Sequence, residues 1–490
     1  MTRSDNPYAN LGVRPFINCC SVRTMHGGSL MLPEVRAAVA EASRMFVNLD
    51  ELMEAASARL AELTGAEWAI VTCGSAAAVA LGTAACVAGN DPVKMLRLPF
   101  TEGMPNRVIM PRNQRFAYDQ AIRMIGTHIV EIDDRAGLDE ALKEPTAMIA
   151  LLGTHEHQSG LRMEEIVSVA KPMGIPILVD AASEHLENPS PWLVRGADLV
   201  VYSGGKFLRG PQTSGLLLGR KDLVQAAWRN ASPHQALGRP MKVSKEDIVG
   251  LVTAVEYWFK HRDAAAERRR WAGDLDVIAG KIGGIAVTAV QEPEGVERVP
   301  RLRITWDAAR TGMDGNALRE KLMRGTPRIM LDDMSATACS IAIDPFGLQP
   351  GEAAAVGDAI AIALSANAQP AAHAAPLAAS VAGEWEIAVQ FMHGSRTHRM
   401  RLGQTGSTIA GRHESPEFSG AVTGELTAEG VAFKFETRFE GSNIGYRFVG
   451  HLTNGGMNGT VMFGTSTDHH QGVVNLGQFG TGKFAANRIA

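Results

Sequence analysis

The sequence predicts an α/β protein with a mainly parallel central sheet, helices on both of its faces, a smaller α/β subdomain and a separate antiparallel β domain. Three observations lead to this fold class. Short apolar runs alternate with amphipathic stretches between residues 66 and 219, an Ala/Pro segment interrupts the chain at 369–380, and regular apolar/polar alternation follows that segment. At 490 residues the chain is also too long for a single hydrophobic core.

The strands of the central sheet come from short, nearly continuous apolar runs. These runs are EWAIVTCG, RVIMP, HIVEID, AMIALLG, IPILVDAA, DLVVYSGG and SGLLLGR. Runs of this kind, separated by helical patterns, are typical of parallel strands that are buried on both faces. Ligands bind such sheets at the carboxyl ends of the strands, and Gly74-Ser75, Asp180 and Ser203–Lys206 all follow strand candidates.

The chain after residue 250 predicts a helix, a smaller α/β portion and a β domain. We expect a helix over 250–279, with the charged run Glu267–Arg270 as its solvated face rather than a binding patch. IAVTAV, RLRITW and SIAIDP are strand candidates of the smaller portion. WEIAVQF, VAFKFETRF and YRFVGHL alternate apolar and polar residues, which predicts an antiparallel barrel or sandwich with a hairpin at Asn454-Gly455-Gly456.

These patterns divide the chain into four parts. We expect an N-terminal segment with the large domain over 1–250, a small α/β subdomain over 251–368, the Ala/Pro linker over 369–380 and the β domain over 381–490.

Composition argues against several classes of partner. Lys and Arg total 48 against 52 for Asp and Glu, so the net charge of -4 offers no basic excess for nucleic acid. No apolar run reaches the roughly 20 residues of a membrane span, and the N-terminus does not resemble a signal peptide. The five cysteines lack metal-ligand spacing. We therefore expect a cytoplasmic protein without a membrane segment.

The segment YSGGKFLRGPQTSGLLLGR places Lys206 behind two glycines at the end of an apolar strand. A lysine in an enzyme cavity can form a Schiff base once burial or a neighbouring cation lowers its pKa toward neutrality. Asp180 ends the strand IPILVD, where a carboxylate could keep the ring nitrogen of pyridoxal 5'-phosphate protonated. The two residues together point to this cofactor.

A phosphate site is the third element of the prediction. CGSAAAVALG opens a helix of small residues, and the backbone N–H groups of Gly74, Ser75 and Ala76 could bind a phosphate. Ser203 could add a hydrogen bond. Each element alone has an ordinary alternative: a surface lysine, a helix-capping aspartate or a tight turn. In the order phosphate turn, strand-end aspartate and strand-end lysine, they favour the cofactor.

These segments resemble fold-type I pyridoxal-phosphate enzymes, in the branch of bacterial selenocysteine synthase. The resemblance covers roughly residues 10 to 365, and ALGRPMKVSKEDIVGLVTAVEYW is most similar to the D-glucosaminate-6-phosphate ammonia-lyase group. It implies that Lys206 binds the cofactor as a Schiff base, that Asp180 pairs with the ring nitrogen and that Ser75 binds phosphate. It also implies a homodimer or higher assembly in which Gln212 and Thr213 reach the partner's cofactor. The β domain has no place in the family pattern.

Substrate-binding residues are predicted less sharply. His155 and His157 follow a strand and could contact substrate or cofactor, while their spacing without a third ligand argues against a metal site. Arginines suit a substrate carboxylate because their fork matches two oxygens, and Lys242 could take a substrate phosphate. The candidate arginines are Arg14, Arg112, Arg115, Arg209, Arg239 and Arg328, with Arg209 favoured by its closeness to Lys206 and Arg239 by its family-like segment.

The reaction expected from these residues is an α,β-elimination. Lys206, once displaced by an amino acid substrate, removes the α-proton as a general base, and the products are ammonia and a 2-oxo acid. A racemase or epimerase, an aldolase or a transferase would use the same residues. A non-enzymatic scaffold with a degenerate cofactor fold is the remaining alternative. The intact lysine, aspartate and phosphate turn argue against that scaffold.

Overall fold

The computed structural model describes residues 6–293, 299–333, 335–365, 380–391, 394–415, 419–426, 430–466 and 480–489. The chain forms two compact units. The first comprises 1–115, 119–307 and 314–365, and the second comprises 366–490 with two short pieces, 116–118 and 308–313. The predicted linker at 369–380 lies outside the described residues except for Ser380.

All seven apolar runs form the strands of one sheet in the first unit. The sheet order is β2-β8-β7-β6-β5-β3-β4. Its strands are β2 (Trp68–Thr72), β3 (Arg107–Pro111), β4 (His128–Ile132), β5 (Thr146–Leu152), β6 (Ile177–Asp180), β7 (Leu199–Ser203) and β8 (Gly215–Gly219). Strand β8 runs antiparallel to both β2 and β7, while the other pairs are parallel.

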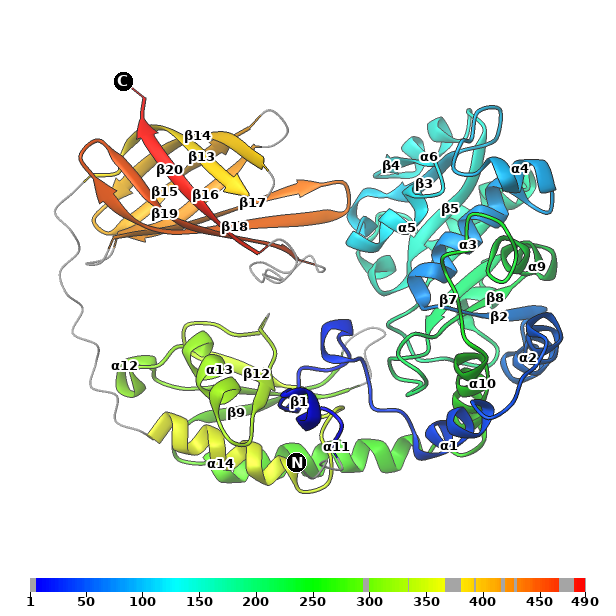
Figure 1. Cartoon of the computed structure of the whole chain (residues 1–490), viewed down its shortest axis with the longest axis horizontal. Helices are drawn as coiled ribbons and strands as arrows, with labels where there is room; N and C mark the ends of the chain where they lie inside the picture. The colour runs from blue at the N-terminus through cyan, green and yellow to red at the C-terminus, as the bar shows by residue number, and fades with distance from the viewer. Residues whose placement is uncertain are drawn as a thin grey trace. The chain divides into compact units, whose positions relative to one another are not determined.

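Helices pack on this sheet because their buried faces are almost entirely apolar (Figure 1). Helix α3 (Ser75–Ala88) packs against β5, β7 and β8, and its small side chains are nearly all buried. Helix α2 (Leu49–Thr64) packs on β2, and α1 (Pro33–Ala42) packs on α10. The other helices are α4 (Pro92–Arg97), α5 (Gln120–Arg123), α6 (Arg135–Ala141), α7 (Met163–Ala170), α8 (Pro191–Val194) and α9 (Lys221–Asn230).

The single helix expected over 250–279 is instead two helices. Helix α10 spans Lys245–Lys260, and α11 spans Ala264–Ile282. The Asp263 side chain accepts a hydrogen bond from the Ala266 N–H over 2.8 Å, so it caps α11 and separates the two helices. The expected division of the chain at residue 250 falls inside α10.

A small subdomain completes the first unit. Its antiparallel strands, in the order β12-β10-β9, overlap the three predicted runs: β9 (Val287–Gln291), β10 (Arg301–Thr305) and β12 (Ser340–Ile343). Helices α11 and α14 (Glu352–Ser365) lie side by side, and α13 (Gly315–Arg324) completes the helices here (Figure 1). Helix α12 (Ala308–Thr311) belongs to the short piece 308–313 of the second unit. Strand β1 (Ile17–Cys19) pairs in parallel with β11 (Ile329–Leu331), so the N-terminal segment joins this subdomain.

The second unit contains a closed antiparallel barrel of eight strands. They are β13 (Gly383–Phe391), β14 (Gly394–Thr405), β15 (Thr408–Glu414), β16 (Ser419–Leu426), β17 (Val431–Phe439), β18 (Ser442–Thr453), β19 (Gly456–Ser466) and β20 (Thr481–Arg488). Each strand pairs with the next, and β20 closes on β13. The expected hairpin is confirmed, because Thr453 pairs with Gly456 across Asn454 and Gly455. Among the described residues, no helix is long and apolar enough to cross a membrane.

Candidate active site at the carboxyl edge of the sheet

Strand register brings the predicted cofactor residues to one edge of the sheet. Thr72 of β2 and Ser203 of β7 both pair with Gly215, the first residue of β8. Asp180 of β6 pairs with Val201 of β7. The carboxyl ends of β2, β6 and β7 therefore meet at the same edge, where the Lys206 turn also begins.

The predicted phosphate turn lies against the start of β8. Gly74 has φ +94° and is the N-cap of α3, and no side chain of the described residues caps this helix end. A Cβ on Gly215 would lie 2.3 Å from the Gly74 carbonyl carbon and 2.6 Å from the Ser75 nitrogen, so this contact needs glycine. Ser75 is half-buried and Ala76 is exposed in the first turn of α3. The helix thus begins with backbone N–H groups that no side chain occupies.

Asp180 is a buried carboxylate at the end of β6. It is 8% exposed, and one of its oxygens accepts the Ala182 N–H over 2.9 Å. Burial raises the pKa of the Asp180 carboxyl above its ordinary value, while the Ala182 N–H and the positive charge of Lys206 lower it. A buried carboxylate of this kind is stabilised as an anion by a cationic hydrogen-bond donor.

Lys206 lies in the turn that follows β7, and its Nζ donates to Ser183 Oγ over 2.6 Å. Ser183 is three residues beyond Asp180, so this bond holds the lysine amine beside the end of β6. The two glycines before Lys206 allow close packing of neighbouring protein atoms. A Cβ on Gly204 would lie 2.0 Å from Ser214 Oγ, and one on Gly205 would lie 2.5 Å from Gln212 Cα.

A segment far away in the sequence completes the Lys206 turn. Both the N–H and the Oγ of Ser29 donate to the Gly205 carbonyl, over 2.9 and 3.0 Å. Gly28 has φ +70°, and a Cβ there would lie 2.7 Å from the same carbonyl oxygen. This segment lies within the stretch of family resemblance, but no role was predicted for it, and its only local signal is the pair Gly27-Gly28.

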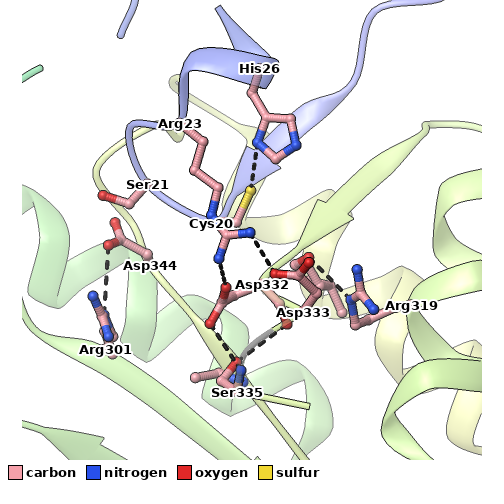
Figure 2. A network of polar contacts seen from close by, with 12 residues as sticks. Cys20, Ser21, Arg23, His26, Arg301, Arg319, Asp332, Asp333, Ser335 and Asp344 are labelled. Atoms are coloured by element: carbon pink, nitrogen blue, oxygen red, sulfur yellow. Dashed lines mark hydrogen bonds and ion pairs between the residues drawn. The ribbon is translucent and has the colours of Figure 1, made fainter. Parts of the chain in front are cut away.

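The same N-terminal segment carries a polar network that connects it to the small subdomain. Figure 2 shows Arg23 forming ion pairs with Asp332 and Asp333, which follow β11. Cys20 Sγ lies 3.1 Å from His26 Nδ1. Burial raises the pKa of the Cys20 thiol to about 12 although Arg23 lowers it, so the thiol stays protonated at neutral pH. The network is therefore a structural connection rather than a nucleophilic centre.

Gln212 and Thr213 follow the Lys206 turn and are both exposed. Gln212 Nε2 donates to the Thr24 carbonyl over 3.1 Å, and Thr213 Oγ1 donates to Asp247 Oδ2 over 3.0 Å. Their expected role toward a partner's cofactor stays a prediction.

The predicted substrate residues are spread over several segments. His155 is half-buried and His157 is exposed in the 3-10 helix Gly153–Gln158, which follows β5 at the edge that carries Asp180. Arg239 donates to Ser232 Oγ over 3.4 Å, and Lys242 is exposed in the segment before α10. Within the described residues, the structure gives neither Arg239 nor Lys242 a contact with the Lys206 turn.

The candidate arginines differ in the hydrogen bonds and ion pairs that they already form within the protein. Arg209 has φ +54°, and its Nε donates to the Leu30 carbonyl over 3.1 Å. Burial, assisted by Arg270, lowers the pKa of the Arg209 guanidinium. Arg112 and Arg115 share the carboxylate of Glu131 in ion pairs. Arg14 donates to the Gly325 carbonyl over 2.6 Å, and Arg328 donates to the Arg14 carbonyl over 3.2 Å.

The arrangement fits pyridoxal 5'-phosphate. The uncapped start of α3 offers backbone donors to a phosphate, and the buried Asp180 carboxylate lacks a cationic partner other than the nearby Lys206 charge among the described residues. The Lys206 amine, held at Ser183, supplies the group that an aldehyde requires. Phosphate, ring nitrogen and aldehyde therefore each find a matching group at one edge of the sheet.

Comparison with known proteins identifies enzymes of this class. The chain is 33% identical over 358 residues to a 5'-C-glycyluridine monooxygenase-decarboxylase of Streptomyces sp, covering 70% of this chain and 88% of that protein. It is 31% identical over 364 residues to the D-glucosaminate-6-phosphate ammonia lyase of Salmonella typhimurium (strain 14028s / SGSC 2262), covering 72% and 96%. An L-seryl-tRNA(Sec) selenium transferase of Proteus mirabilis (strain HI4320) is 27% identical over 277 residues, covering 49% and 55%. No protein-family model matches the chain.

A solved structure agrees with these matches. The structure of D-glucosaminate-6-phosphate ammonia-lyase superposes with a TM-score of 0.66 at 31% identity, covering 75% of this chain and all of that one. Both the fold and the cofactor expected from the sequence are thereby confirmed. The chain belongs to the fold-type I, pyridoxal-phosphate-dependent enzymes of the selenocysteine synthase-like family that contains D-glucosaminate-6-phosphate ammonia-lyase, and it carries an appended C-terminal β-barrel.

Proposed function

We propose that the protein is a pyridoxal-phosphate-dependent lyase that removes ammonia from a small hydroxy amino acid or amino sugar acid by α,β-elimination and yields a 2-oxo acid. The observation that carries the proposal is the placement of the Lys206 amine 2.6 Å from Ser183 Oγ, at the strand end that holds the buried carboxylate of Asp180. A relative named as an ammonia lyase, 31% identical over 364 residues, supports the reaction class.

Each residue has a distinct part in this proposal. Bound at this edge, the cofactor supplies an electron sink for the negative charge that develops at the substrate α-carbon. Asp180 keeps the ring nitrogen protonated, which strengthens that sink. The first turn of α3, at Ser75 and Ala76, holds the phosphate. The Lys206 amine accepts the α-proton as a general base, and Ser183 orients the amine for that transfer.

Two experiments test the proposal. Borohydride reduction of the purified protein followed by peptide mapping should place the reduced cofactor on Lys206. A screen of β-hydroxy amino acids and amino sugar acids should then detect ammonia together with a 2-oxo acid. Label on another lysine would contradict the site, and turnover without ammonia would contradict the reaction.

The other reaction classes give different products from the same residues. A racemase or epimerase returns the inverted amino acid, an aldolase releases an aldehyde, and a transferase needs a second substrate to consume the first. A scaffold without catalysis would show no cofactor absorbance even after pyridoxal phosphate is added. Product analysis on one set of substrates therefore separates these alternatives.

A second candidate function comes from the 33% identical relative that is named as a monooxygenase-decarboxylase. An enzyme of that class would consume dioxygen and release carbon dioxide from an amino acid attached to a nucleoside. An oxygen electrode distinguishes the two functions, since elimination of ammonia needs no dioxygen.

We further propose a homodimer or higher assembly in the cytoplasm, with no nucleic-acid partner. The segment between α1 and α2 exposes Met45, Phe46 and Val47, and Phe46 is 102% exposed. Adjacent apolar side chains of this kind are typical of an interface. All five cysteines are free, which supports a reducing compartment. Light scattering should find at least two chains per particle, and Phe46→Glu should lower that number.

A further inference from the structure

A pocket of about 250 Å³ lies where the segment after β6 meets the junction of α10 and α11. His185 and Glu187 line it from the first side. Arg262, Arg268 and Trp271 line it from the second side. Four of these five side chains carry N–H donors, and only Glu187 contributes a carboxylate.

The two arginines differ in how far they are already neutralised. The Arg262 guanidinium lies 3.8 Å from the centre of the Trp258 ring and donates to Glu267 over 2.7 Å. Arg268 is exposed, and the described residues give it no ion pair. The charged run that the sequence analysis assigned to a solvated face thus contributes a guanidinium to a pocket.

Trp271 adds a donor without an acceptor. Its side chain is 2% exposed, and its indole N–H has no hydrogen-bond partner among the described residues. A buried donor without an acceptor is unfavourable, and a ligand with acceptor oxygens in the pocket would relieve it. Ala264, the first residue of α11, also lines the pocket, so the positive end of a 19-residue helix lies there.

Aromatic contacts connect the pocket to the lysine turn. The ring of His185 lies edge-on to that of Phe207, with centroids 4.7 Å apart, and Phe207 directly follows Lys206. Phe207 in turn contacts Phe346 at 5.3 Å, and Phe346 lies 6.1 Å from Trp271. A ligand in the pocket would therefore touch two rings that are linked to the residue beside the catalytic lysine.

We infer that this pocket binds an anion of the phosphate class. Phosphate offers several strong acceptor oxygens, which match guanidinium, imidazole and indole donors that come from separate elements. The anion has two possible sources: the phosphate of a phosphorylated substrate, or free phosphate bound beside the active site. Only the first source rests on the proposed function. The donors that line the pocket support anion binding whichever reaction the protein catalyses.

Calorimetric titration of the full-length, cofactor-loaded protein with inorganic phosphate tests the site. Arg268→Gln should weaken phosphate binding about tenfold, since it removes a charge-assisted hydrogen bond. Trp271→Phe keeps the ring, removes the N–H and should weaken binding about fivefold. Arg269→Gln is the matched control, because the Arg269 side chain is next to Arg268 in the sequence, is 71% exposed and does not line the pocket. Phosphate binding to this variant should stay within about twofold of wild type.

Two results would reject phosphate binding at this pocket. Absence of phosphate binding to the wild type, or equal affinity in Arg268→Gln and Arg269→Gln, would overturn it. Arg268 is exposed, so its replacement should leave the fold intact even where Trp271→Phe does not.

O-phosphoserine distinguishes the two sources of the anion. If Arg268→Gln weakens both probes and phosphate displaces O-phosphoserine, the pocket takes the substrate's phosphate. If it weakens inorganic phosphate alone, the pocket takes a free anion. Heat of binding needs no turnover, so failure of the ammonia screen with retained phosphate binding would reject the proposed reaction and keep the pocket.

Discussion

Asp180 and Lys206 illustrate how chemistry is set at the scale of single residues. The carboxylate is buried at a strand end, and the lysine amine is fixed by a hydroxyl three residues beyond it. Burial raises the pKa of Asp180 above its ordinary value, so a cationic partner would stabilise its ionised form. A ring nitrogen that carries a proton would be that partner.

Asp180→Asn tests this pairing. We expect ammonia release to fall by roughly 10²-fold or more, because the amide does not stabilise a positive charge on the ring nitrogen. Lys206 should still bind the cofactor, with an altered absorbance spectrum. Asp198→Asn is the control, since Asp198 is also buried but pairs with Lys171 and Arg220. That variant should lose stability and keep the wild-type spectrum; a changed spectrum in both variants would contradict the assignment.

Gly215→Ala tests the packing of the phosphate turn. The new methyl group would lie 2.3 Å from a Gly74 backbone atom, so the turn must move and affinity for the cofactor should fall at least about tenfold. Gly273→Ala is a matched control, because nothing lies within 4 Å of a Cβ in the middle of α11. It should raise stability by about 0.5–1 kcal/mol. Equilibrium titration with pyridoxal phosphate measures the first effect, and thermal unfolding measures the second.

At the scale of elements, the strands that are buried on both faces could be predicted best from the sequence. The seven strands of the sheet could be predicted because both faces are covered, so their residues are almost all apolar. The break between α10 and α11 was missed because Asp263 caps a helix within an otherwise helical pattern. The bond from Ser29 to Gly205 joins residues 176 apart, and no local pattern records such a contact.

The barrel should lose stability in mild acid because of His413. Burial, with smaller contributions from His398 and Arg412, lowers the pKa of this imidazole from 6.5 to about 4, while a backbone contact at Glu436 raises it. The unfolded chain therefore takes up the proton first, so the stabilisation is complete above pH 6.5 and is lost as the pH falls toward about 4.

Calorimetry of the full chain can measure this dependence. The barrel transition is the one that disappears when residues 380–490 are deleted. His413→Leu should reduce the slope of its midpoint between pH 6.5 and 4. An unchanged slope would assign the acid sensitivity to other groups.

At the scale of the whole molecule, the two units have separate hydrophobic cores. A chain that ends at Ser365 should therefore fold and keep the cofactor absorbance of the full protein. Absorption spectra before and after dialysis against pyridoxal phosphate measure this. A folded truncation without colour would show that the barrel takes part in cofactor binding.

The number of domains could be predicted from composition, because the Ala/Pro segment and the change to strict alternation mark the start of the barrel. Which segments make up the small subdomain could not be predicted in the same way. Strand β1 lies at the N-terminus but pairs with β11, and this pairing depends on tertiary packing that a local pattern does not contain.

That pairing has a consequence for biosynthesis. The ion pair between Arg23 and Asp333 can form only after the ribosome has added another 310 residues. At a translation rate of about 5–20 residues per second, the nascent N-terminus spends roughly 15–60 s outside the ribosome before β11 emerges. During that interval, its apolar side chains are available to chaperones and proteases, and the first unit is completed only when the N-terminal segment meets a strand that is synthesised much later.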